Sequence, residues 1–445
     1  AAGSALGAVA ALGSVRLRRP PRSRRPAPAP TWSGRKNRRG ILFWLKLIAV
    51  LVLVVVVAAA VFVAVQLERA VPRPSLQTVS VKSAAVPGPA PAIPWPKAGQ
   101  AELAVAGIGS FGPVGSTSPI PIGSIAKVMA AYVILHDHPL TGTATGPGIT
   151  VTAADVALYR TDLASQDSVA AVTAGEVLTE RQALEALLIP SGDNIAVLLA
   201  NWDAGSVPAF VAKMNSTAAA LGMHHTHYAD VSGLSARTTS TASDQLRLAP
   251  AVMADPVFAG IVAMPQVTLP VAGTVYNYNS LVGRDGVIGI KTGSTPQAGG
   301  CLLFAAKAKL AGQPETIYGA VLGQPSAGHG IIAASLAVSQ RLLDAAKAAV
   351  HQVTILPAGT LGAKVETPWA GATPAVTPTP VRFIGWPGLP TKVTVSRGSA
   401  PARSSPAGTV VGHVKVQLGS QHASVPLRTT KATSGPTIGW RLRHG

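Results

Sequence analysis

A chain of 445 residues with 48% hydrophobic composition contains enough apolar material for more than one packed core, which excludes a disordered polymer. The formal charge of +19 resembles that of nucleic-acid-binding proteins, but residues 1–46 contain eleven Arg and Lys residues and no acidic residue. The excess charge is therefore mostly a property of one terminal segment, and no nucleic-acid-binding surface is predicted. The single cysteine, Cys301, excludes an intrachain disulfide framework and is expected to be a small buried strand residue.

The N-terminal part of the chain has the composition of a membrane-anchored segment. Residues 1–40 combine basic residues with Pro, Ala and Gly, which predicts a disordered cytoplasmic tail. Leu47–Val65 is nineteen residues without a polar side chain, and at about 1.5 Å per residue it approaches the roughly 30 Å hydrocarbon core of a bilayer. We predict that residues 41–66 cross the cytoplasmic membrane once and leave the rest extracytoplasmic, since basic flanks remain in the cytoplasm. A cleaved secretory signal is the alternative, and it also exports the remainder.

Three further regions follow this segment. Seven prolines between residues 67 and 97 predict an extended Pro-rich linker that holds the next domain away from the membrane. Residues 98–350 have the pattern of a folded catalytic domain. Short β-branched runs such as Val410–Val416, separated by Pro, Gly and Thr clusters, predict a small all-β domain at residues 351–445.

The pattern within residues 98–350 mixes helices with strands. A helix is predicted to begin near Ser124, because apolar residues recur at the spacing of one buried face, namely Ile125, Val128, Met129 and Tyr132. Thr179–Gln182 has the sequence of a capping box that opens a second helix, which Pro190 ends. Further helices are predicted at 210–221, 243–253 and 331–350, and strands at 103–108, 287–290, 301–305 and 317–322. Helices combined with an antiparallel sheet indicate an α+β fold.

Three short motifs in this domain have the order expected of a serine acyltransferase. They are Ser124-Ile125-Ala126-Lys127, Ser191-Gly192-Asp193-Asn194 and Lys291-Thr292-Gly293-Ser294. A serine hydroxyl is a weak nucleophile at neutral pH, and a lysine one helical turn later accepts its proton only when that lysine is uncharged. We predict Ser124 as the nucleophile and Lys127 as the general base, with burial and the positive charge of Lys291 disfavouring the charged form of Lys127. Ser-x-x-Lys alone is common by chance, so the inference depends on the ordered set.

The third motif is predicted at the end of an apolar strand, where alternate side chains face one side. Gly293 is expected to leave room for an extended substrate peptide alongside this strand. The N–H groups of Ser124 and Ser294 are candidate oxyanion donors, and the hydroxyls of Thr292 and Thr295 are candidates for binding a terminal carboxylate.

With these motifs the chain resembles the D-alanyl-D-alanine carboxypeptidases, which are low-molecular-weight penicillin-binding proteins and serine peptidases of the S11 type. The resemblance covers about residues 98–345 and extends to shorter segments, namely Ala174–Glu176, Met214–Asn215, Leu221–Met223, Thr226–Tyr228, Ser232–Leu234 and Ala298–Gly299. It implies a penicillin-binding, β-lactamase-like catalytic domain followed by a small β domain, here preceded by one transmembrane helix.

The resemblance also implies an activity, namely removal of the terminal D-alanine from peptidoglycan stem peptides through an acyl-enzyme on Ser124. Lys127 then accepts the proton, Ser191 relays a proton to the leaving D-alanine, and Lys291 orients Ser191 and the substrate carboxylate. The residues predicted to bind substrate are Asp193, Asn194, Lys291, Thr292, Gly293, Ser294 and Thr295. β-Lactam antibiotics are expected as covalent inhibitors, and no cofactor, metal or nucleic acid is expected.

Two departures from the family pattern affect these expectations. The family's second motif usually has Asn at its third place, where this chain has Asp193, with Asn194 after it. A carboxylate accepts hydrogen bonds without donating them and favours a charged Lys127, so either Asn194 faces the cleft or activity is reduced. The family also often uses a late arginine for the substrate carboxylate, but none lies between Arg284 and Arg341, which leaves His329 or the threonines as candidates.

Other functions remain open at this point. A D,D-transpeptidase would use the same site with an amine as acceptor, and a weak β-lactamase is a related alternative. Since no glutamate lies between Glu185 and Glu315, slow acylation by penicillin is expected rather than rapid hydrolysis. A catalytically impaired wall-binding or scaffold protein is the alternative from another class. The histidines at 224, 225 and 227 lack the further ligands and spacing of a zinc site.

Overall fold

The computed structural model describes residues 38–326 and 330–444 of the chain. Most of the predicted basic tail and His329 lie outside these described residues. The chain divides into two units, which are described separately below, residues 71–437 and a smaller unit that joins the N-terminal segment to residues 438–445.

The smaller unit contains two helices, α1 (Arg38–Glu68) and α10 (Ile438–His444). By length and composition, α1 is apolar enough to cross a membrane. The Arg441 guanidinium of α10 donates a hydrogen bond to the carbonyl oxygen of Leu67, in the last turn of α1. The last carbonyl groups of a helix have no N–H partner within that helix, and this hydrogen bond satisfies one of them.

A five-stranded antiparallel sheet organises residues 100–324 of the larger unit, in the order β10-β11-β12-β2-β3. These strands are β2 (Gln100–Val105), β3 (Gly109–Gly115), β10 (Val287–Thr295), β11 (Gly299–Leu310) and β12 (Gln313–Gln324). Residues 301–306 of β11 are all buried, because successive side chains enter different cores on the two faces of the sheet. One core contains Cys301, Leu303 and Ala305, and the other contains Leu302, Phe304 and Ala306.

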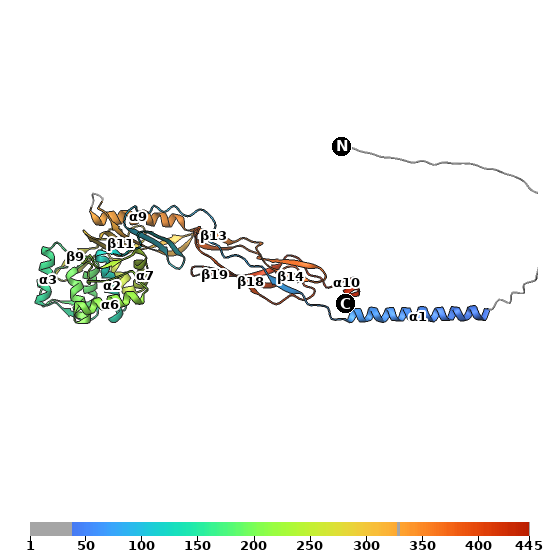
Figure 1. Ribbon diagram of the computed structural model, residues 1–445. Coiled ribbons are helices and arrows are strands. Elements are labelled where there is room, and N and C mark those ends of the chain that lie inside the picture. The colour runs from blue at the N-terminus through green and yellow to red at the C-terminus, as the bar shows by residue number, and fades with distance from the viewer. Residues whose placement is uncertain (1–37, 327–329, 445) are drawn as a thin grey trace, which may run out of the picture. The chain divides into compact units, whose positions relative to one another are not determined.

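Helices cover both faces of this sheet, as Figure 1 shows for α9 on one side and for α2, α6 and α7 on the other. The helix α9 (Ile331–Ala349) packs on β11 and β12. The opposite face carries α2 (Ala126–Asp137), α4 (Glu180–Leu188), α5 (Asp193–Ala204), α6 (Val207–Ala220), α7 (Ala242–Met253) and α8 (Pro256–Val262). Remaining elements are η1 (Gly123–Ile125), α3 (Ala153–Ala164), β4 (Ile120–Pro121), β5 (Gly148–Thr150), β6 (Val177–Thr179), β7 (Thr239–Ser240), β8 (Gln266–Leu269) and β9 (Gly273–Tyr276).

Several predicted elements are confirmed. The helix expected near Ser124 is η1 followed by α2, and the capping box of α4 is present, since Thr179 accepts a hydrogen bond from the N–H of Gln182. The helix α4 ends at Leu188, two residues before Pro190.

The C-terminal part of the larger unit is all β, as its sequence pattern predicts. The predicted β domain of residues 351–445 is too long, however, because residues 438–444 form the helix α10 of the smaller unit. A six-stranded sheet has the order β1-β14-β15-β19-β18-β17, and a two-stranded sheet pairs β13 with β16. Their bounds are β1 (Ser75–Thr78), β13 (His351–Leu356), β14 (Leu361–Thr367), β15 (Gly371–Val376), β16 (Val381–Gly385), β17 (Lys392–Arg397), β18 (Val410–Leu418) and β19 (Gln421–Thr429).

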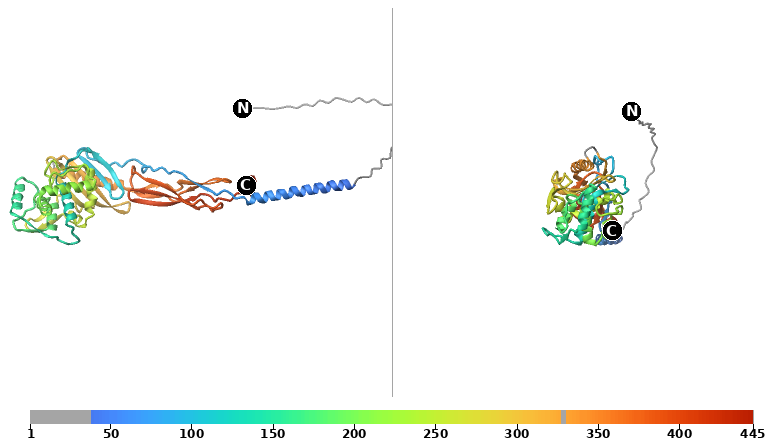
Figure 2. Two further views of the ribbon diagram at one scale, coloured as in Figure 1. Left: turned by 60° about the horizontal axis from the view of Figure 1, so that its bottom comes forward. Right: turned by 90° about the vertical axis from the view of Figure 1, so that its left-hand side faces the viewer.

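Part of the predicted Pro-rich linker, residues 67–97, pairs with the C-terminal sheet. Its strand β1 pairs with β14, from Ser75 opposite Glu366 to Thr78 opposite Ala363 (Figures 1 and 2). Farther along, the N–H of Val86 donates to the carbonyl of Leu389 at 2.8 Å. Pro72 and Pro74 precede β1, and no proline interrupts its four residues, which allows a short edge strand that the proline-rich composition conceals.

Glu180, the first residue of α4, is a buried carboxylate without a hydrogen-bond partner among the described residues. Burial raises its pKa from 4.5 to about 7, and the charge of Arg181 offsets this only in part. Because the folded state keeps this proton to higher pH than the unfolded chain, raising the pH from 4.5 to 7 destabilises the fold, by up to about 3 kcal/mol. We therefore expect Glu180→Gln to raise the melting temperature at pH 8, with a smaller gain at pH 5.

Thermal unfolding followed by circular dichroism at the two pH values measures this difference. The half-buried Glu366 of β14 provides a control, and Glu366→Gln should show no comparable pH-dependent gain. Equal stabilisation by Glu180→Gln at pH 5 and pH 8 would contradict a raised pKa for Glu180.

Candidate active site

Ser124 lies in the tight turn that leads into α2. It occupies the middle of η1, and the neighbouring Ile125 and Ala126 are fully buried. Ser124 itself is half-buried, so its hydroxyl is the side-chain group that this turn leaves accessible. The N–H groups of a first helical turn have no partner within the helix, which suits an oxyanion site.

Lys127 is fully buried, and its ammonium nitrogen is surrounded by oxygen atoms. Lys127 Nζ lies 2.7 Å from Ser124 Oγ and 2.6 Å from Asp193 Oδ1. It also lies 3.4 Å from Ser191 Oγ and 3.3 Å from the carbonyl oxygen of Ser232. The first two motifs therefore meet at a single nitrogen atom, although 64 residues separate Lys127 from Ser191.

Ser191 occupies the turn between α4 and α5 with a backbone φ of 65°, a conformation that is costly for a residue with a side chain. It is buried, and the turn directs its hydroxyl toward Lys127. Asp193 follows as the first residue of α5, where a negative charge interacts favourably with the helix dipole.

Asn194 lies differently from the prediction. Its side-chain oxygen accepts from the N–H of Ala170 at 3.1 Å, and its amide nitrogen donates to the carbonyl of the same residue at 2.9 Å. Successive helical residues point about 100° apart, so only one of Asp193 and Asn194 can face Lys127. Asp193 does so, while the amide of Asn194 is occupied in fixing the neighbouring loop. This geometry is at odds with the prediction that Asn194 binds substrate.

The third motif forms the end of β10, which is the edge strand of the central sheet. Lys291 and Thr292 are buried, whereas Ser294 and Thr295 are half-buried. Lys291 Nζ donates to the carbonyl of Thr292 at 3.2 Å, and no hydrogen bond joins it to Ser191 within the described part of the chain. Burial, followed by the positive charge of Lys127, lowers the pKa of Lys291 well below its usual value.

Gly293 is needed for a different reason from the one predicted. A Cβ atom at this position would lie 2.5 Å from the carbonyl oxygen of Ile122 and 3.1 Å from the backbone nitrogen of Ser124. A side chain would therefore collide with the turn that carries Ser124, so the absence of one allows β10 to approach η1. A Cβ atom on Gly123 would likewise lie 3.0 Å from the nitrogen of Ser294. These close approaches bring together the two predicted oxyanion donors.

Further negative charge lies near this centre. Burial and the charge of Asp193 raise the pKa of Asp162, at the end of α3, and of Asp167 in the following loop. The backbone N–H of Asp193 donates to the carbonyl of Ser168 at 2.7 Å, which holds this loop next to α5. Asp162 and Asp167 are thus neighbours of the site that the sequence analysis did not identify.

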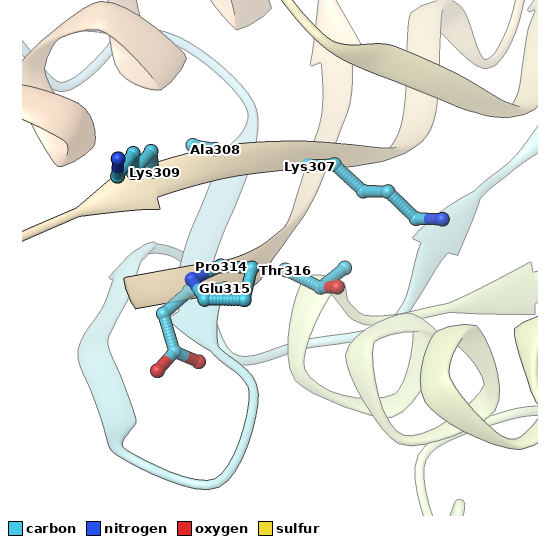
Figure 3. Close-up of a pocket in the computed structure, with 6 residues that line it drawn as sticks. All are labelled: Lys307, Ala308, Lys309, Pro314, Glu315 and Thr316. Carbon is cyan, nitrogen blue, oxygen red and sulfur yellow. The ribbon is translucent and has the colours of Figure 1, made fainter. Parts of the chain in front are cut away.

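A separate pocket of about 530 Å³ lies at the hairpin formed by β11 and β12 (Figure 3). The side chains that line it come from Lys307–Lys309 and Pro314–Thr316, and none belongs to the three motifs. No group of three or more His, Cys, Asp or Glu side chains able to hold a metal ion occurs within residues 38–326 and 330–444.

Comparison with known proteins identifies the family. Residues 115–322 match the family model for D-alanyl-D-alanine carboxypeptidases, Peptidase_S11. The D-alanyl-D-alanine carboxypeptidase of Streptomyces sp. (strain K15) is 32% identical over 221 residues, which are 46% of this chain and 72% of that protein. The chain belongs to the D-alanyl-D-alanine carboxypeptidase family.

Two further members of this family are similar to the chain. The D-alanyl-D-alanine carboxypeptidase DacB2 of Mycobacterium tuberculosis is 37% identical over 185 residues, 40% of this chain and 59% of that protein. The crystal structure of D-alanyl-D-alanine carboxypeptidase DacD from Francisella tularensis matches 80% of this chain and 97% of its own, with 19% identity and a TM-score of 0.55. The predicted family and α+β fold are confirmed.

Proposed function

We propose that this chain is a serine D,D-carboxypeptidase that removes the terminal D-alanine from peptidoglycan stem pentapeptides. The observation that carries the proposal is the 2.7 Å contact between Lys127 Nζ and Ser124 Oγ inside a domain of this family. The two groups lie where a general base and a nucleophile need to be, within hydrogen-bond reach of each other.

In the proposed acylation, Ser124 Oγ forms a bond to the carbonyl carbon of the penultimate D-alanine while its proton passes to Lys127. The bond from that carbon to the terminal D-alanine nitrogen breaks, and Ser191 relays a proton to the leaving amine. The backbone N–H groups of Ser124 and Ser294 stabilise the developing negative charge on the carbonyl oxygen. Water then cleaves the ester bond to Ser124 and restores the enzyme.

The edge strand β10 offers the substrate a place to bind. An extended peptide can pair with the edge of β10 that has no neighbouring strand, which places its scissile carbonyl next to Ser124. Thr292, Ser294 and Thr295 provide hydroxyl groups along this edge for the terminal carboxylate. Asp193 accepts from the substrate backbone, and Lys291 contributes to orienting Ser191.

We further propose that α1 anchors the enzyme in the cytoplasmic membrane as a single span, with the catalytic domain on the outer side. Its length and composition support this role, as does the basic segment that precedes it in the sequence. The substrate is extracytoplasmic, so this topology places the active site where the stem peptides are.

Labelling with a fluorescent penicillin and assay of D-alanine released from a D-Ala-D-Ala pentapeptide test the proposal together. We expect a covalent adduct on Ser124 and stoichiometric release of D-alanine from the peptide. Both should disappear in Ser124→Ala and persist in Ser339→Ala, which changes a buried serine of α9 outside the site. If the folded wild-type protein forms no adduct and releases no D-alanine, the proposed carboxypeptidase activity is refuted.

The 2.6 Å ion pair between Asp193 and Lys127 supports a second candidate, a catalytically impaired protein that binds cell-wall peptides. An ammonium group held in such a pair has no lone pair with which to accept a proton. The same penicillin labelling distinguishes the two, because the binding protein forms no covalent adduct while it still retains the peptide.

A further inference from the structure

Asp230 folds a loop next to the proposed site, and the three motifs do not include it. Its Oδ2 atom accepts hydrogen bonds from the backbone N–H groups of Gly233 at 3.0 Å, Leu234 at 2.9 Å and Ser235 at 3.3 Å. The hydroxyl of Ser232 donates to the same oxygen at 3.2 Å. Four donors on one carboxylate oxygen fix the backbone of this loop in a single turn.

The other oxygen of Asp230 closes the far end of the loop. Its Oδ1 accepts from the hydroxyl of Thr238, which is fully buried and itself accepts from the N–H groups of Ala229 and Asp230. The carbonyl of Thr238 accepts from the N–H of Ile122 at 3.4 Å, two residues before Ser124. The loop held by Asp230 is therefore attached directly to the segment that carries the nucleophile.

This loop touches the proposed catalytic groups at two points. The carbonyl of Ser232 accepts from Lys127 Nζ at 3.3 Å. Gly233 has a φ of 89°, and a Cβ atom there would lie only 1.9 Å from the carbonyl oxygen of Gly123. The loop backbone thus packs against the nucleophile turn without an intervening side chain.

The contact with Ser232 bears on how Lys127 works as a base. A neutral lysine amine has two N–H donors and one lone pair. The Asp193 carboxylate and the Ser232 carbonyl can only accept hydrogen bonds, so each takes one N–H. The lone pair is then left for a hydroxyl that donates, and Ser124 Oγ at 2.7 Å lies closer to it than Ser191 Oγ at 3.4 Å. This is the geometry that proton abstraction requires.

We propose that Asp230 is a positioning residue for acyl transfer, an inference that rests on the function proposed above. By folding the loop from Asp230 to Thr238, it places the Ser232 carbonyl where it orients the amine of Lys127. It also holds Gly233 against the turn of Ser124. Asp230 does not touch the reacting atoms, so its effect is on the rate of the chemical step rather than on substrate binding.

The test compares steady-state kinetics of Asp230→Ala and the wild type, both as the full chain in detergent, with kcat expressed per penicillin-titrated site. We expect kcat to fall by about 30- to 100-fold with KM within about threefold, since a small misplacement of reacting groups costs about this much in rate. Asp230→Asn keeps one oxygen for the loop N–H groups and should restore at least about a third of the wild-type kcat.

A matched control separates this role from general destabilisation. Asp255 also fixes a turn through its carboxylate, which accepts from the N–H groups of Val257 and Phe258 at the start of α8. Asp255→Ala should lower the melting temperature but leave kcat per titrated site within about twofold of the wild type. If Asp230→Ala fails to fold, Thr238→Val should still lower kcat by about fivefold. This substitution keeps the Asp230 carboxylate but removes the hydroxyl that donates to its Oδ1 and accepts from the N–H groups of Ala229 and Asp230.

If Asp230→Ala keeps the wild-type kcat per titrated site, the positioning role of Asp230 is overturned while the proposed function stands. If Asp230→Ala does not fold, a wild-type kcat in Thr238→Val has the same meaning. An equal loss of kcat in Asp255→Ala would also overturn the positioning role of Asp230, since the loss of kcat would then follow from lower stability. Absence of acylation in the wild-type protein would instead overturn the proposed function and, with it, the role assigned to Asp230.

Discussion

Replacing Lys127 with methionine should lower the rate of acylation of Ser124 by about 10³-fold. Lys127 Nζ is the titratable group that contacts Ser124 Oγ, at 2.7 Å, and methionine fills similar space without a base. Stopped-flow measurement of adduct formation with a fluorescent penicillin gives this rate directly. The D-alanine released from a pentapeptide should fall in parallel.

The Lys127→Met variant also removes the ion-pair partner of the buried Asp193. Removal of the lysine alone leaves the Asp193 carboxylate buried without its ion pair, which costs roughly 3–5 kcal/mol of stability. The double variant Lys127→Met with Asp193→Asn avoids that charge and should be equally inactive while better folded. Lys213→Met is the control, because Lys213, like Lys127, forms ion pairs, here with Asp137 and Asp203, but lies outside the site. Acylation at more than about a tenth of the wild-type rate in a folded Lys127→Met would show that another group is the base.

Replacing Asp193 with asparagine should increase acylation at neutral pH by about tenfold. The amide oxygen still accepts a hydrogen bond from Lys127, but the ion pair is lost. An uncharged amine is the form that can accept the proton of Ser124. The negative charge of Asp193 also raises the pKa of Asp162 and Asp167, and those two values should fall in the variant.

Stopped-flow measurement of adduct formation with a fluorescent penicillin at pH 7 measures this effect. Asp203→Asn provides the control, since Asp203 is a buried carboxylate paired with a lysine elsewhere in the domain, and it should leave the acylation rate unchanged. A lower acylation rate in Asp193→Asn would contradict the argument. It would indicate that the reaction needs the charged carboxylate.

Much of the candidate site follows from local signals in the sequence. The spacing from Ser124 to Lys127 places both groups on one face of a helical turn, and the capping box at Thr179 and the break at Pro190 locate the turn that carries Ser191. These signals depend on residues a few positions apart, whose relative positions the backbone geometry determines.

Other features depend on contacts between distant segments. The sequence offers Asp193 and Asn194 as equivalent candidates, and only packing of α5 against the loop at Ala170 decides that Asp193 faces Lys127. The need for glycine at 293 arises from the carbonyl of Ile122, about 170 residues away in the chain. The pairing of β1 with β14 joins segments almost 300 residues apart.

The amino-acid sequence by itself thus determined the family, the candidate nucleophile with its neighbouring lysine, and an apolar segment long enough to cross a membrane. The tertiary structure decided which carboxylate meets Lys127, where the third motif approaches Ser124, and that Asp230 folds the adjoining loop. The physical reason is that hydrophobic periodicity and capping act within one or two helical turns. Hydrogen-bond partners and close backbone contacts across the core exist only once the separate elements have packed together.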